Sequence, residues 1–180
     1  MKKDSRRFFD IFIRYTILIL VALPNLFIFY FIFTPLTIYS IYFLFNLFFD
    51  TSLLGNIFIL NEKIAIELIK ACIAGSAYYF LLILNLSIPK IKIAKRIKMI
   101  IFAFSSLLLI NILRIFFLSL VAYSGYSFFD IAHELFWYFM SIIFVVGIWF
   151  AEVKVFKIKE IPFYSDLRFL HKKSFFKKIN

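Results

Sequence analysis

Residues 71–88 read ACIAGSAYYFLLILNLSI, and this stretch decides the fold because it is apolar throughout and long enough to cross a bilayer as a helix. Pro89 follows directly and ends that helix. The next nine residues, KIKIAKRIK (90–98), carry five Lys and Arg. An apolar stretch that ends in a short basic loop is typical of a transmembrane helix whose carboxyl end lies in the cytoplasm.

The composition of the whole chain agrees with an integral membrane protein. Hydrophobic residues make up 64% of the 180, and 28 residues are Phe, which is more apolar surface than a soluble core of this size needs. The formal net charge of +11 resembles that of nucleic-acid-binding proteins. Its basic residues flank apolar segments, however, so we interpret them as topology signals and expect no nucleic-acid partner.

We predict an all-α polytopic membrane protein that forms a single membrane domain over residues 1–180. A cytoplasmic flank (1–10) precedes the first span, and a basic cytoplasmic tail (152–180) follows the last. The stretch 34–49 is apolar but short, and it is either an interfacial helix or a short span. The four expected spans cover residues 11–33, 71–88, 99–121 and 131–151.

Residues 50–70 differ from the apolar segments on either side. The runs 56–60 and 64–66 are rich in β-branched residues, and they flank the polar turn Asn61-Glu62-Lys63. This pattern predicts a short β-hairpin or an extended segment outside the bilayer, before the second span.

The distribution of positive charge gives the orientation. The amino-terminal flank with Arg14, the loop 90–98 and the tail together hold 18 of the 21 Lys and Arg. The positive-inside rule therefore places both termini and this loop in the cytoplasm. Residues 50–70 and the short loop 123–130 then lie outside.

Three unusual membrane residues, Cys72, Arg114 and His133, fall near the same membrane face under this topology. Cys72 starts the second span at its outer end, and His133 lies at the outer end of the fourth. Arg114 lies seven residues before Val121, about 10 Å below the outer end of the third span, and its guanidinium can reach outward. We therefore expect the three side chains to meet in one outer pocket.

The chemistry of this trio is that of a thiol enzyme. A nearby cation stabilises the thiolate that attacks, and Arg114 stays charged, so it can stabilise a thiolate or an oxyanion. His133 can move protons near neutral pH. A charge inside a span is costly and usually marks function, although Arg114 can instead form a structural ion pair with Asp130 or Glu134. No metal-ligand pattern or phosphate-binding loop is present in the sequence, so we expect no metal and no cofactor.

Three segments carry a resemblance to the archaeosortase/exosortase family of prokaryotic membrane proteins. They are Ala71-Cys72-Ile73-Ala74-Gly75-Ser76, Asn111-Ile112-Leu113-Arg114-Ile115, and His133 early in the following helix. The resemblance covers about residues 53–150 and includes the extended segment before the cysteine. The chain departs from the family in its Cys72-Ile73-Ala74, where exosortases commonly have Cys-Ser-Gly, and in its short length, which makes it a compact variant.

The resemblance implies a cysteine protease or transpeptidase in the prokaryotic cell membrane, with its active site on the extracytoplasmic side. Its partners would be exported proteins with a C-terminal tripartite sorting signal, and a membrane lipid or cell-surface group would be the acceptor. Cys72 would be the nucleophile, Arg114 would stabilise the oxyanion, and His133 would transfer protons. By helix spacing, Asn111, one turn before Arg114, would orient the guanidinium, and Ser76, one turn after Cys72, would line the site. Either side chain can instead hydrogen-bond its own backbone.

Two other functions are compatible with the sequence. In a small binding or transport component, Arg114 would hold an anionic solute and Cys72 would be incidental. In a structural or assembly protein, Phe-rich packing would suffice and neither residue would be needed. Replacement of Cys72 by Ala separates the enzyme from both alternatives.

Overall fold

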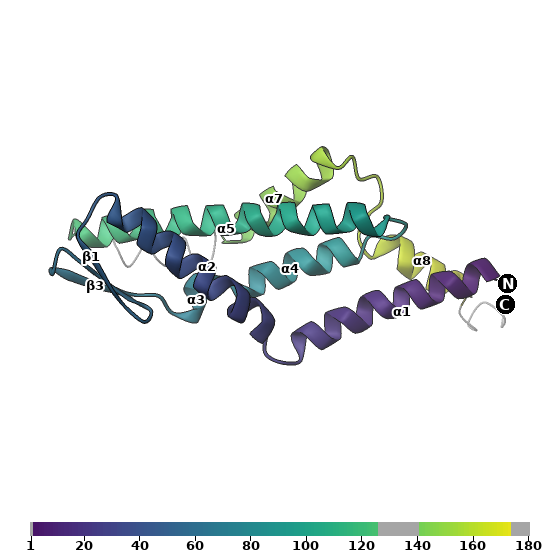
Figure 1. Ribbon diagram of the computed structural model, residues 1–180. Helices are drawn as coiled ribbons and strands as arrows, with labels where there is room; N and C mark the ends of the chain where they lie inside the picture. The colour runs from purple at the N-terminus through teal and green to yellow at the C-terminus, as the bar shows by residue number, and fades with distance from the viewer. Residues whose placement is uncertain (1, 126–140, 174–180) are drawn as a thin grey trace.

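The computed structural model describes residues 2–125 and 141–173, which form a largely helical structure with one small sheet (Figure 1). The sheet lies at one end, and the amino-terminal helix and the carboxyl-terminal helix α8 lie at the other. The helices are α1 (Lys2–Ala22), α2 (Phe27–Asn46), α3 (Lys70–Ile73), α4 (Gly75–Leu86), α5 (Ile93–Tyr123), α7 (Ser141–Val155) and α8 (Tyr164–Lys173). The strands are β1 (Thr51–Leu54), β2 (Ile57–Leu60) and β3 (Ile64–Glu67).

The predicted first span, 11–33, is not one continuous helix. Helix α1 ends at Ala22, and a turn separates it from α2. Pro24 has no backbone N–H to continue a helix, and Asn25 and Leu26 adopt left-handed backbone angles (φ 50° and 59°). Most of the stretch 34–49, which we expected as a separate short segment, belongs instead to α2, together with the end of the predicted first span.

The predicted hairpin is present, and it has one more strand than expected. Strands β2 and β3 pair antiparallel around a turn in which Asn61 and Glu62 have positive φ angles. Strand β1 pairs with the other side of β2 through a turn at Gly55 (φ 65°), so the sheet order is β1-β2-β3. Asn61 Nδ2 donates to the Tyr123 hydroxyl (3.1 Å), which ties the sheet to the end of α5.

The segment predicted as the second span is divided near its start. Ala74 has a left-handed backbone (φ 60°) and separates the single-turn helix α3 from α4. Helix α5 is longer than the predicted third span because it starts within the basic loop, at Ile93. Of the predicted fourth span, the structure describes residues 141–151, which lie in α7.

Two apolar clusters hold these elements together. The first joins α2, α4, α5 and α7, and in it Phe33 stacks on Tyr78 with ring centroids 3.7 Å apart. The second seats the sheet on α2 and α5. Its fully enclosed members are Ile41, Phe45, Phe58 and Leu60. The second cluster fixes the sheet, and therefore the start of α3, against α5.

The carboxyl-terminal helix α8 is bound to α1 by a buried ion pair. Arg14 donates to Asp166 Oδ2 (2.8 Å) and to the Leu86 carbonyl oxygen (2.7 Å). Arg7 donates to the Ser165 carbonyl oxygen (2.9 Å). Arg14, which we interpret as one of the basic topology signals, has a side chain that is only 5% exposed.

Helices α2 and α5 are long enough and apolar enough to cross a membrane. Large apolar side chains are exposed on one face of α5 at intervals of four residues. They are Ile101, Leu109, Leu113 and Phe117, with Ser105 at the intervening position. Exposed apolar rows of this kind favour association with a membrane.

Candidate functional site

Cys72 lies in the short helix α3, directly after the sheet. Its backbone N–H donates to the Ile69 carbonyl oxygen (2.9 Å), which closes the single turn. Ala74 then redirects the chain into α4. A Cβ atom at the next residue, Gly75, would lie 2.8 Å from Tyr30 Cζ, so glycine allows α2 to pack closely here. The local sequence therefore places Cys72 in a tight corner of the chain, between the sheet and α4.

Two polar residues of α5 bind the backbone carbonyl group of Cys72 at this corner. Asn111 Nδ2 donates to the Cys72 carbonyl oxygen (2.7 Å), and Arg114 Nη2 donates to the same oxygen (3.4 Å). Asn111 and Arg114 are 3% and 8% exposed. Residues three apart on a helix share a face, so the Asn-x-x-Arg spacing lets both side chains reach one acceptor.

Arg114 also reaches a third element. Its Nη1 donates to the Ser141 hydroxyl oxygen at the start of α7 (3.2 Å). Its buried Nε has no hydrogen-bond partner within residues 2–125 and 141–173. The guanidinium therefore lies between α3 and α7, and its Nε–H is a donor that no described residue uses.

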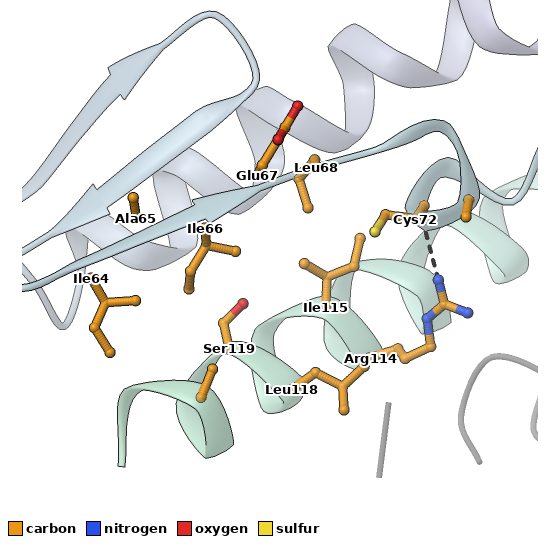
Figure 2. Close-up of a pocket in the computed structure, with 12 residues that line it drawn as sticks. Ile64, Ala65, Ile66, Glu67, Leu68, Cys72, Arg114, Ile115, Leu118 and Ser119 are labelled. Carbon is orange, nitrogen blue, oxygen red and sulfur yellow. Dashed lines mark hydrogen bonds between the residues drawn. The ribbon is translucent and has the colours of Figure 1, made fainter. Parts of the chain in front are cut away.

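Cys72 and Arg114 line one cavity of about 290 Å³ between β3 and α5 (Figure 2). In Figure 2 the Cys72 sulfur points toward the space between this strand and α5, and Arg114 lies at the same end of the cavity. The rest of the lining is mainly apolar. It comprises Ile64, Ala65, Ile66, Glu67, Leu68, Ala71, Ile115, Leu118, Ser119 and Ala122. A thiol and a cation thus share one end of a mainly apolar cavity between β3 and α5.

The structure brings together only part of the predicted site. Cys72 and Arg114 meet at the cavity, and Asn111 binds the Cys72 backbone rather than the guanidinium. Ser76 is exposed and does not belong to the lining. His133 lies outside the described residues, as do Asp130 and Glu134, the predicted partners for a structural ion pair with Arg114.

Three polar residues of the site were not predicted from the sequence. Ser141 binds Arg114, and Ser119 and Glu67 line the cavity. A polar residue inside an apolar helix is a weak signal, which would have drawn attention to Ser119, five residues after Arg114. Nothing in the sequence distinguishes Ser141 from an ordinary packing serine.

No protein-family model matches this chain, and the searches of curated proteins and of solved structures found no significant match. The resemblance to archaeosortases and exosortases therefore remains a prediction from three short segments. What the geometry adds is the position of Cys72 beside Arg114, since these residues lie 42 positions apart in the chain.

Proposed function

We propose that the chain is a membrane cysteine transpeptidase or peptidase of the archaeosortase/exosortase type. It would cleave the C-terminal sorting signal of exported proteins and transfer the new carboxyl end to a lipid or cell-surface acceptor. The observation that carries the proposal is the shared cavity of Cys72 and Arg114. A thiol that served only for packing would not need a buried guanidinium from a distant helix beside it.

The chemistry would proceed through a thioester. The Cys72 thiolate attacks the carbonyl carbon of the scissile amide, and Arg114 stabilises the negative charge that develops on the carbonyl oxygen. The C–N bond then breaks, and the amine leaves with a proton supplied by His133. An acceptor amine or hydroxyl, deprotonated by His133, attacks the thioester and releases the thiolate. Asn111 would act as a positioning residue because it holds the backbone of the nucleophile.

The arrangement of charge supports a multi-pass protein with its site on the extracytoplasmic side. The starts of α1 and α5 and the helix α8 lie at one end of the molecule, and the sheet lies at the other (Figure 1). The segments rich in Lys and Arg are therefore gathered at the end away from the sheet. Under the positive-inside rule, the end with the sheet would face the outside of the cell, and Cys72 would be accessible from that side.

The test is co-expression with an exported reporter that bears a candidate tripartite tail from the same genome, followed by size and by mass spectrometry. We expect the tail to be lost with the wild type and retained with Cys72→Ala. Ser52→Ala serves as the matched control, because Ser52 is exposed on β1 and lies away from the cavity. Equal processing by wild type and Cys72→Ala would reject the thiol mechanism.

One observation favours the alternative of an anion-binding component. The buried Nε of Arg114 lacks a partner among the described residues, and an anionic solute would satisfy it. A carrier of this kind would tolerate Cys72→Ala and lose its function with Arg114→Ala. The enzyme should lose its activity with either substitution.

A further inference from the structure

Strand β3 is an edge strand that runs directly into the site. It pairs with β2 on one side, and within the part of the chain that the structure describes no strand pairs with its other side. The Leu68 N–H donates to the Asn56 carbonyl oxygen (2.9 Å). Antiparallel strands exchange hydrogen bonds at every second residue, so the backbone groups of Ala65 and Glu67 point away from β2. Among residues 2–125 and 141–173, no strand pairs with these groups, and they form a hydrogen-bonding edge.

The cavity follows this edge. Five consecutive residues, 64–68, line it. Neighbouring side chains of a strand point to opposite faces, so a cavity that touches five in a row extends along the strand edge rather than over one face. Its opposite wall is the side of α5 that carries Ile115 and Leu118 (Figure 2).

We propose that this edge binds an extended peptide as a fourth strand of the sheet. The inference rests on the proposed function, and it specifies the conformation of the bound substrate and where the substrate binds. Main-chain hydrogen bonds to Ala65 and Glu67 would hold the peptide, and the apolar wall would accept aliphatic side chains at alternate positions. Because β3 leads within five residues to Cys72, a peptide on this edge extends toward the thiol and Arg114.

In strand addition, the protein recognises mainly the backbone of the substrate. The occupant is an extended segment of an exported protein and not a helix, because a helix has no free backbone groups to offer a strand edge. Substitution of substrate side chains should therefore weaken binding less than removal of the substrate amide hydrogens does.

Binding of a fluorescein-labelled Val-Thr-Val-Thr-Val-Thr peptide to the full chain in lipid nanodiscs, followed by fluorescence anisotropy, tests the proposal. The comparison probe is the same peptide with its three central amides N-methylated, which removes donors for either orientation on the edge. We expect the methylated peptide to bind about tenfold more weakly or worse. Equal binding of both would assign the cavity to apolar ligands in general and overturn the proposal, as would binding of neither.

Two variants locate the binding on β3. Ala65→Pro removes an N–H that is not used by β2 and should abolish the preference for the unmethylated peptide. Ala65→Val keeps this N–H and should retain the preference. A preference that survives Ala65→Pro would place the peptide elsewhere and contradict the inference. Should the proline variant fail to fold, equal binding of the two peptides by the wild type would still overturn the proposal.

The peptide assay on the wild type and the reporter assay on Cys72→Ala separate this inference from the proposed function. Preferential binding of the unmethylated peptide together with equal reporter processing by wild type and Cys72→Ala would reject the thiol mechanism alone. Loss of the peptide preference with thiol-dependent processing intact would reject strand addition alone.

Discussion

At the scale of single residues, Arg114 carries the most specific prediction. Arg114→Lys keeps the positive charge but loses the planar fork that reaches both Cys72 and Ser141. We expect reporter processing to fall by about 100-fold, because the loss of one oxyanion donor typically costs this much. Arg168→Lys is the matched control, since Arg168 is exposed on α8. Processing at the wild-type rate by Arg114→Lys would show that the reaction does not require the guanidinium.

Ala74 gives a second prediction at this scale, on stability. Its left-handed backbone (φ 60°) is strained for any residue with a Cβ. Ala74→Gly should therefore leave the free energy of unfolding unchanged or raise it. Ala77→Gly, in the regular part of α4, should lower it by about 1 kcal/mol. Thermal unfolding of both variants in detergent checks this, and an equal loss of stability would show that Ala74 is not strained.

The turn at Ala74 also shows which part of the site could be predicted from the sequence. The closeness of Cys72 to Arg114 could be predicted because helix direction and charge bias predict that both chain segments lie near the same membrane face. The role of Ser76 could not, because that prediction assumed a continuous helix from Ala71 in which Cys72 and Ser76 share a face. The turn at Ala74 breaks this relation and leaves Ser76 exposed. Asn111 was expected to orient the guanidinium, and it donates instead to the Cys72 carbonyl oxygen, which Arg114 also contacts.

At the scale of elements, the attachment of α8 to α1 gives a third prediction. Asp166→Ala would remove the buried carboxylate that pairs with Arg14, and we expect a loss of about 3 kcal/mol in the free energy of unfolding. Asp10 also pairs with Arg14 (3.1 Å), but its side chain is 55% exposed. Asp10→Ala should therefore cost about 1 kcal/mol or less. Chemical denaturation in detergent measures both variants, and similar losses would contradict the ranking by burial.

Elements were predictable where the local pattern was strong. The turn at Asn61-Glu62-Lys63 and the β-branched runs beside it predict the β2–β3 hairpin, which the structure confirms. Strand β1 was not predicted because Thr51 is the one β-branched residue among its four, so it lacks the β-branched pattern that marks β2 and β3. The boundary between α1 and α2 was missed because apolar residues continue on both sides of Pro24, so hydrophobicity alone did not show the turn.

At the scale of the whole molecule, the proposed orientation predicts which ends are accessible from outside the cell. In a Cys72→Ser background, Glu62→Cys places a thiol in the exposed turn of the hairpin, and Lys95→Cys places one in the exposed start of α5. We expect a membrane-impermeant maleimide to label the first in intact cells and the second only after permeabilisation. The reverse pattern would invert the topology and place the Cys72 end of the molecule in the cytoplasm.

The central claim is that Cys72 forms a thioester with its substrate. The most direct measurement is mass spectrometry of the wild-type protein, quenched in acid after co-expression with the tailed reporter. The account predicts a reporter fragment attached to the peptide that contains Cys72 and released by hydroxylamine. The adduct should be absent from Cys72→Ala. Processing of the reporter by the wild type with no adduct on Cys72, or with undiminished processing by Cys72→Ala, would contradict the account.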